Sequence, residues 1–220
     1  METSLHRQLK DTYASDGAEL EVKLGRYRID VVCGNELIEI QHGSLAAIRR
    51  KIKALLEEHR VRVVKPIVAK KRLVKRKGKG RKVVDQRLSP KRGTVLDLFH
   101  ELVYFSTVFP HPNLILEVPL VFIEEWRYPG HGKRRWRRDR DHQVEDQKLL
   151  EVQNTHEFHT AADLAALLPR DLPQPFHTQH VAEGLKIDRW FARRVAYCLR
   201  ETGAIHQVGK QGNSLLYERN

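Results

Sequence analysis

A glycine–asparagine pair, Gly34-Asn35, lies between two stretches in which apolar and polar residues alternate. Such alternation is typical of a half-buried β-strand, and this dipeptide favours a two-residue hairpin turn. The pair therefore predicts an antiparallel hairpin whose register places Cys33 opposite Glu36. Counting outward along the two strands then places Asp30 opposite Glu39. Two carboxylates that face each other across a strand pair destabilise the sheet unless a cation lies between them.

The same periodicities predict the elements on either side of this hairpin. Apolar residues that recur every three or four positions indicate helices, and short alternating runs indicate strands. The predicted elements are a helix carrying Leu5, Leu9 and Tyr13, strands at 19–24, 26–33 and 36–41, a helix capped by Ser44, and a buried strand at 61–67. The order is thus helix, three strands, helix, strand, which indicates an α/β (α+β) fold.

The acidic pair is accompanied by an amide on the same face of the sheet. Alternation places Gln41 beside Glu39, whereas Ile38 and Ile40 point to the other face. Magnesium ions are held in proteins by one or two carboxylates and keep several waters. The pattern therefore predicts a divalent-metal site at Asp30 and Glu39. The alternative is that both carboxylates are ordinary solvated strand residues.

This element order, with its Asp-(x8)-Glu-x-Gln pattern, resembles the PD-(D/E)xK superfamily of nucleases, also called restriction-endonuclease-like, whose core is αβββαβ. The resemblance covers residues 1–67. It implies that Asp30 and Glu39 bind Mg²⁺ or Mn²⁺ and that Gln41 occupies the position where the family usually has lysine. Glu2 would match the helical glutamate that some members use. The implied activity is metal-dependent hydrolysis of phosphodiester bonds, with these four residues forming the catalytic site.

Gln41 is a departure from the family pattern, because an amide carries no charge and cannot act as a base. Some type II restriction enzymes with Glu-x-Gln remain active. Lys51 or Lys53 on the following helix could supply a migrated cation, although surface charge is the simpler interpretation of both. His42 could orient a water or be only a turn residue. Two hypotheses follow: an active nuclease, or a catalytically inactive nucleic-acid-binding protein on a degenerate nuclease fold.

Positive charge is concentrated in two segments of the chain. The formal net charge is +12, and residues 66–92 alone contribute twelve Lys/Arg against one acid. Residues 131–143 add six Lys/Arg against two acids, which leaves the remainder of the chain at −3. Clustered charge of this kind is a footprint for phosphate backbones, because each neutralised phosphate releases counterions. We therefore predict a nucleic acid as partner, with DNA preferred.

The predicted nucleic-acid-binding residues come from both segments and from the C-terminal region. They are Lys70, Lys71, Arg72, Lys75, Arg76, Lys77, Arg134, Arg135, Arg137, Arg138, Arg193, Arg194 and Lys210. Three alternatives remain open for the basic segments: a solvated loop, a generic acidic surface such as membrane headgroups, and structured RNA such as that of the ribosome.

The chain divides into four predicted segments. They are a nuclease-like core at 1–67, a basic linker or arm at 68–93, an extension of the core at 94–153, and a C-terminal module at 156–220. Within the extension, the apolar run 95–109 predicts a helix packed on the sheet. Strands are expected at 114–126 and 144–152, joined by the second basic segment as a long hairpin.

The C-terminal module reads as three helices followed by two short strands. The helices are predicted at 161–168, 178–185 and 189–202, and the strands flank 209–213. This order resembles a winged helix-turn-helix domain, which implies that the third helix enters the major groove and the hairpin touches the backbone. Winged helices that bind proteins are the alternative. The whole layout is also similar to an uncharacterised bacterial family that joins both modules.

Other compositional features exclude whole classes of protein. Two cysteines cannot form a disulfide scaffold, and a reducing cytoplasm is the expected location. No apolar run approaches the roughly 18 residues that a membrane-spanning helix needs, and the N-terminus lacks a signal-peptide pattern, so no membrane partner is expected.

Overall fold

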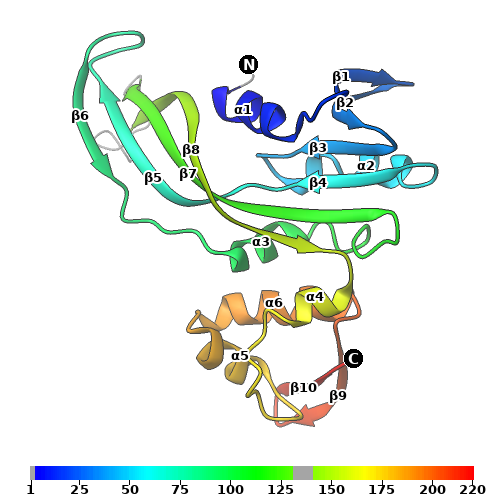
Figure 1. The fold of residues 1–220 in the computed structure, drawn as a ribbon. Helices are drawn as coiled ribbons and strands as arrows, with labels where there is room; N and C mark the ends of the chain where they lie inside the picture. The colour runs from blue at the N-terminus through cyan, green and yellow to red at the C-terminus, as the bar shows by residue number, and fades with distance from the viewer. Residues whose placement is uncertain (1–2, 131–140) are drawn as a thin grey trace.

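The computed structural model describes residues 3–130 and 141–220. A mixed eight-stranded sheet forms the larger part of the molecule, and a helical module with a two-stranded sheet lies beneath it in Figure 1. The α/β class predicted from the sequence is confirmed at this level. One end of the sheet extends away from the body as a curved arm, seen at the left of Figure 1.

The N-terminal elements occur in the predicted order. They are α1 (Ser4–Tyr13), β1 (Glu19–Leu24), β2 (Tyr27–Cys33), β3 (Glu36–Ile40), a 3-10 turn η1 (Leu45–Ala47) with α2 (Arg49–Leu55), and β4 (Arg60–Val64). Strands β1, β2 and β3 are antiparallel, whereas β4 runs parallel to β3. Ser44 caps the helical segment as expected, because its side chain accepts a hydrogen bond from the backbone N–H of Ala46.

The strand predicted at 61–67 is interrupted by Pro66, which has no N–H to donate to a ladder. The chain continues as β5 (Ile67–Arg76), and both β4 and β5 pair in parallel with β7 (Leu114–Pro129). β8 (His142–Phe158) pairs along the opposite edge of β7. β4 and β5 therefore follow each other along one edge of β7, as a broken line of two strands.

The basic segment at 68–93, expected as a linker or arm, forms two strands of the sheet. β5 pairs with β6 (Val83–Leu88), and the two extend beside β7 and β8 as the curved arm in Figure 1. Charge did not prevent strand formation, because buried Leu73 and Val74 anchor the arm while acidic residues of β7 pair with its cations. Cationic side chains on an outer strand also discourage pairing with another molecule.

The β7–β8 hairpin is longer than predicted. It was expected at 114–126 and 144–152, but the ladder extends to the pair Leu116–Phe158. β8 thus runs through positions 153–156, where the boundary before the C-terminal module was expected. The loop that joins the strands, at 131–140, lies outside the described residues.

The apolar run 95–109 forms much less helix than predicted. It contains a 3-10 turn, η2 (Val95–Asp97), one short helix, α3 (Leu98–Leu102), and a series of turns. The β-branched Val103 and Thr107 have low helix propensity, and Ser106 can hydrogen-bond locally instead. Burial is nevertheless as expected, because Phe99, Phe105 and Phe109 are fully buried.

The C-terminal module has the predicted element order. Its elements are α4 (Ala161–Ala165), α5 (Thr178–Leu185), α6 (Arg189–Glu201), β9 (Ile205–Gln211) and β10 (Ser214–Arg219). Thr160 and Asp163 form a capping box at the start of α4. β9 and β10 pair as an antiparallel hairpin.

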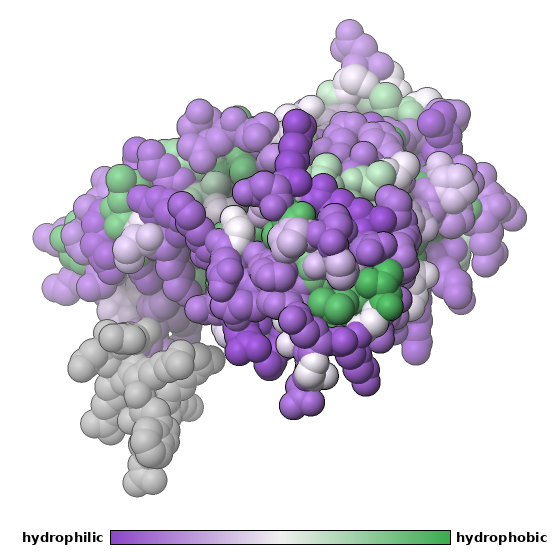
Figure 2. Space-filling model, turned by 90° about the horizontal axis from the view of Figure 1, so that it is seen from below, coloured by the Kyte–Doolittle hydropathy of each residue, from purple (hydrophilic) through white to green (hydrophobic). Residues whose placement is uncertain are grey.

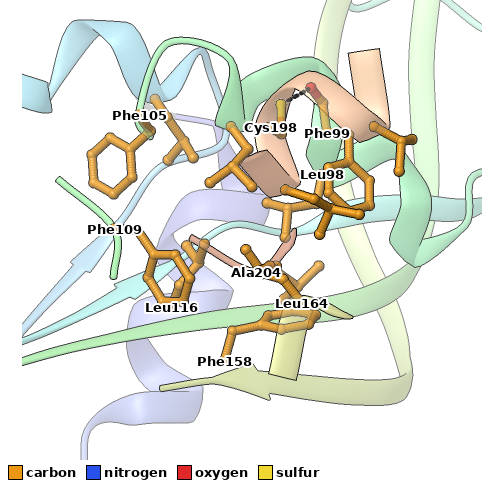
Figure 3. Close-up of a cluster of buried hydrophobic side chains, with 14 of the residues drawn as sticks. Leu98, Phe99, Phe105, Phe109, Leu116, Phe158, Leu164, Cys198 and Ala204 are labelled. Atoms are coloured by element: carbon orange, nitrogen blue, oxygen red, sulfur yellow. Dashed lines mark hydrogen bonds between the residues drawn. The ribbon is translucent and has the colours of Figure 1, made fainter. Parts of the chain in front are cut away.

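One apolar cluster joins the C-terminal helices to the sheet. Figure 3 shows Phe99 of α3, Leu116 of β7 and Leu164 of α4 packed in the same cluster as Cys198 of α6. The Cys198 thiol donates to the Phe99 carbonyl oxygen at 3.7 Å, and burial raises the pKa of Cys198 to about 12. This cysteine is therefore an inert core residue.

A second apolar cluster holds α1 on the opposite face of the sheet. Leu5 and Leu9 of α1 pack with Val31, Ile38 and Ile40 of the hairpin strands. Alternation in β3 is thus as predicted, since both isoleucines lie on this face.

The first turn of α1 is tied to β8 by a carboxylate. Asp146 Oδ1 accepts from the Ser4 N–H at 2.9 Å, and Asp146 Oδ2 accepts from the Ser4 hydroxyl at 2.6 Å. Burial by itself would raise the pKa of Asp146, but these hydrogen bonds outweigh it and the pKa is lowered. A carboxylate at a helix N-terminus is also favoured by the helix dipole.

We expect Asp146→Asn to lower the free energy of unfolding at pH 7 by about 1 kcal/mol, a value kept small by solvent screening at this partly exposed position. Because its folded-state pKa is depressed, the stabilisation is present above the unfolded pKa and is lost as pH falls through the folded pKa. Urea unfolding between pH 7 and pH 3 should show the two proteins converge in acid. A difference that stays constant with pH would contradict this assignment.

None of the helices in the described ranges is long and apolar enough to cross a bilayer. Figure 2 views the molecule from the side of the C-terminal module, where the surface is mainly hydrophilic with small separate apolar patches.

Candidate functional site

The register of the β2–β3 hairpin is the one that the Gly34-Asn35 turn predicts. Cys33 pairs with Glu36, and the ladder continues to Val31 opposite Ile38. Beyond this pair, a side-chain hydrogen bond replaces the backbone ladder: Asp30 Oδ2 accepts from the Ile40 N–H at 2.8 Å. The carboxylate of Asp30 is therefore held at the open end of the hairpin.

Asp30 lies where the alternation of β2 breaks. Ile29 packs in the cluster on the α2 and α3 face, whereas Val31, two residues later, packs on the α1 face. Glu21, the residue that the β1–β2 register places opposite Asp30, has a positive φ of 57°. The distorted backbone lets Asp30 face α1, where His6 Nε2 lies 3.3 Å from Asp30 Oδ1.

Glu39 is buried and has a cationic partner on α2. Lys51 Nζ lies 2.5 Å from Glu39 Oε2 and donates to the Arg28 carbonyl oxygen at the same distance. The Lys51 side chain is only 17% exposed. It is thus a component of the acidic site, and the simpler interpretation of Lys51 as surface charge is wrong.

The two carboxylates have opposite pKa shifts. Burial raises the pKa of Glu39, and the negative charge of Asp30 raises it further, so that Lys51 does not fully compensate. Burial would also raise the pKa of Asp30, but its hydrogen bonds with His6 and the Ile40 N–H outweigh this effect and lower it. The ionised form is therefore favoured at Asp30 and disfavoured at Glu39.

Gln41 is occupied by the turn that follows β3. Its side-chain amide donates to the Ser44 carbonyl oxygen at 2.8 Å, and within the described residues it makes no hydrogen bond with either carboxylate. The buried Lys65 donates to the carbonyl oxygens of His42 and Gly43 in the same turn. Burial lowers the pKa of His42, as do the charges of Lys65 and Lys71, so its imidazole is neutral at pH 7.

The predicted basic residues of β5 fall into two groups. Four of them are engaged within the sheet by acidic or aromatic partners. Lys70 and Arg72 lie over the Phe122 ring, Lys71 pairs with Glu125 at 2.6 Å, and Arg76 lies over Trp126 and pairs with Glu145 at 3.1 Å. Lys75 of β5 and Lys77, which follows the end of the strand, are exposed.

The predicted basic residues of the C-terminal module also fall into two groups, exposed residues and one residue that is hydrogen-bonded within the protein. Arg193 and Lys210 are exposed, on α6 and β9. Arg194 instead donates to His100 Nδ1 of α3 at 2.7 Å, so its guanidinium is used inside the protein. The remaining predicted residues, Glu2, Arg134, Arg135, Arg137 and Arg138, lie outside the described residues.

Within residues 3–130 and 141–220, no three His, Cys, Asp or Glu side chains come together as a metal-binding group. Asp30 and Glu39 lie close together in the structure, and Lys51 and His6 contact them. From the sequence, Lys51 was interpreted as surface charge, and His6 was not predicted to take part. The spacing of Lys51 from Ser44 places it on α2, but its direction depends on how α2 packs. No sequence signal identified His6.

Comparisons with known proteins identify a family and a relative of this chain, and neither description names an activity. An uncharacterized protein of Treponema pallidum (strain Nichols) is 31% identical over 223 residues, an alignment that covers 99% of this chain and 85% of that protein. No solved structure matches the chain. Residues 3–159 match a family described as Domain of unknown function (DUF8091). Because this match covers well over half of the chain, the protein belongs to the DUF8091 family.

Proposed function

We propose that this protein is a Mg²⁺-dependent nuclease that hydrolyses phosphodiester bonds in DNA. The observation that carries the proposal is the pair of half-buried Asp30 and buried Glu39 at the open end of a hairpin, with Lys51 at 2.5 Å from Glu39. Two acids and a lysine are the residue types that the PD-(D/E)xK pattern requires. Here the lysine would come from α2 in place of Gln41.

The donor set fits a hard divalent cation. Mg²⁺ is commonly held by one or two carboxylates, with waters completing its coordination. Burial raises the pKa of Glu39, and the charge of Asp30 raises it further, so a cation bound between the two carboxylates would offset their repulsion. A bound Mg²⁺ would supply Lewis-acid stabilisation of the phosphate and lower the pKa of a bound water. Asp30 and Glu39 would be its protein ligands.

The chain's own residues would perform the other tasks. Lys51, held by Glu39 and the Arg28 carbonyl, would place a positive charge where negative charge develops on the phosphate. His6 would keep Asp30 oriented and ionised. The exposed stripe of α6, formed by Arg189, Arg193 and Tyr197, would contact DNA from a winged-helix module with Lys210 on its hairpin.

A second candidate function is supported by one specific observation. Glu39 is already paired with Lys51, and Gln41 is hydrogen-bonded to Ser44. Because these side chains already have partners within the protein, the site suits a DNA-binding protein that has lost catalysis and retains its basic surfaces.

The direct test incubates the full chain with plasmid, branched DNA, single-stranded DNA and structured RNA, with Mg²⁺ or Mn²⁺ and with EDTA. Cleavage that requires the divalent ion supports the nuclease. Salt-sensitive binding without cleavage of any substrate would support the second candidate, and preference for structured RNA would overturn DNA as the substrate.

We expect Lys51→Met to reduce cleavage about 10- to 100-fold, because the variant lacks the cation that stabilises charge in the transition state. Lys51→Arg should recover part of the rate. Lys53→Met is the matched control, since Lys53 is exposed on the same helix and should leave the rate unchanged. Single-turnover cleavage checks the prediction, and equal losses in both methionine variants would contradict it.

A further inference from the structure

The curved arm contains a cavity that the acidic site does not use. It has a volume of about 820 Å³ and lies between β5, β6 and the end of the β7–β8 hairpin. A second cavity of about 540 Å³ adjoins it, and Leu73, Arg87 and Arg127 line both. We call the two together the arm cleft.

The described lining of the arm cleft combines an apolar floor with a cationic rim. The floor is formed by Leu73, Val84, Pro90, Tyr128 and Pro129. The rim contains the exposed cations Lys75, Lys77 and Arg87 and the acids Asp85 and Asp141. In the described part of the chain, none of these three cations joins an ion pair. The cations that line the first cavity outnumber its acids, and an excess of positive charge beside apolar surface fits a ligand that is anionic along one side and apolar along the other.

An unpaired DNA strand has this chemistry. Its bases present flat faces that stack on apolar and aromatic side chains, and its phosphates bind a positively charged groove. A duplex buries its base faces in its own stack and offers only phosphates and groove edges. The cleft also has the volume of a small-ligand site, which admits a few splayed nucleotides and excludes a double helix.

The floor favours DNA over RNA. Each RNA sugar carries a 2′-hydroxyl, which is both donor and acceptor and is the group by which proteins distinguish RNA. An apolar floor would remove water from this hydroxyl without replacing its hydrogen bonds, which is costly.

The arm cleft lies on the way to the acidic pair. Lys71 and Glu125, which pair with each other, line the second cavity. Gln147 donates to Glu125, and the neighbouring Asp146 accepts from Ser4 in the first turn of α1, the helix that carries His6. His6 contacts Asp30. A strand that leaves the cleft beside Glu125 would therefore pass the first turn of α1 and then meet Asp30.

We propose that the arm cleft binds single-stranded DNA and delivers it to the acidic pair, so that the substrate is an unpaired strand or the unpaired part of a branched DNA. This inference rests on the proposed nuclease function for the delivery step. The binding step stands on the cleft alone.

The test measures fluorescence anisotropy of a labelled oligothymidylate in EDTA, where no cleavage occurs. The full chain should bind it at least about tenfold more tightly than a duplex of equal length. The double substitution Lys75→Glu with Arg87→Glu should weaken binding at least about tenfold and reduce the slope of log K against log salt by about 1.4, since each lost contact contributes roughly 0.7. Lys23→Glu with Arg60→Glu is the control, because both residues are exposed on strands of the body.

Each result has a defined meaning, provided that thermal unfolding shows all variants to be folded. Equal affinity for duplex and single strand, equal weakening by both double substitutions, or equal affinity for oligouridylate would overturn the proposal. Selective binding of single strands without Mg²⁺-dependent cleavage would support the binding role of the arm cleft and contradict only the nuclease activity. If the arm substitutions change neither cleavage nor binding, the result would support the nuclease activity and contradict only the binding role of the arm cleft.

Discussion

Asp30→Asn is expected to reduce Mg²⁺-dependent cleavage of DNA by about 10³-fold, because the variant retains the shape of the side chain and removes one of the two charges that we propose as ligands of the cation. The amide can still accept the Ile40 N–H, so the hairpin should remain folded. Affinity for DNA in EDTA should stay the same or increase, since a negative charge is removed beside the bound phosphate. Initial rates under single-turnover conditions and anisotropy measure the two effects separately.

Asp11→Asn provides the matched control. Asp11 is an exposed acid on α1, the helix that also supplies His6, and its substitution changes the net charge by the same amount. It should leave the cleavage rate unchanged. If Asp30→Asn cleaves DNA as fast as the unaltered protein, the acidic pair is not the active site, even if the protein is a nuclease.

Arg62→Met is expected to lower the free energy of unfolding by about 3 kcal/mol, because it leaves clustered acids without their shared cation. Arg62 Nε lies 3.0 Å from Glu36 Oε2, and its Nη1 lies 2.5 Å from Glu117 Oε2 and 2.8 Å from Glu157 Oε1. Glu117 is buried and also accepts from the Tyr13 hydroxyl of α1. The loss should therefore extend to the docking of α1 on the sheet.

Chemical denaturation with two spectroscopic probes measures this loss. Arg60→Met is the control, since Arg60 is exposed on the same strand and should change stability by less than about 0.5 kcal/mol. Adding Glu117→Gln to Arg62→Met should recover part of the loss, because it removes one of the uncompensated charges. A change below about 1 kcal/mol in Arg62→Met would show that solvent already screens the cluster.

Some of the geometry around the acidic pair can be predicted from local sequence patterns. The Gly34-Asn35 turn predicts the observed register from the pair Cys33–Glu36 to the pair Val31–Ile38. The ladder ends before the predicted pair Asp30–Glu39, because the alternation of β2 breaks at Asp30 and its carboxylate faces α1. Period-two alternation also predicts correctly that Ile38 and Ile40 pack on the α1 face. Both inferences depend on contacts within about ten residues, where chain geometry leaves few alternatives.

Contacts between distant elements did not follow from such patterns. Lys51 and His6 reach the acidic pair from helices on either side, and their direction depends on the rotation of each helix against the sheet. Likewise, Arg194 belongs to an exposed-looking basic run of α6, but the packing of α6 on α3 turns it toward His100. Periodicity identifies an apolar stripe and does not identify what covers it.

The basic segment gives the clearest example of the same limit. Its composition correctly located the positive charge and predicted a basic linker or arm at 68–93, but it did not reveal that the segment forms β5 and β6 of the sheet. Pairing with β7 supplies the hydrogen bonds and the acidic partners Glu124 and Glu125, which composition cannot reveal.

The amino-acid sequence alone was sufficient to predict the α/β class, the order of the elements and the register of the β2–β3 hairpin, because hairpin register is a property of a few adjacent residues. Tertiary structure alone decided which cations neutralise those acids, which basic residues remain exposed, and that the arm contains a cleft. These outcomes depend on how separate elements pack, and packing is set by the whole core, including the apolar cluster that joins α3 to α6.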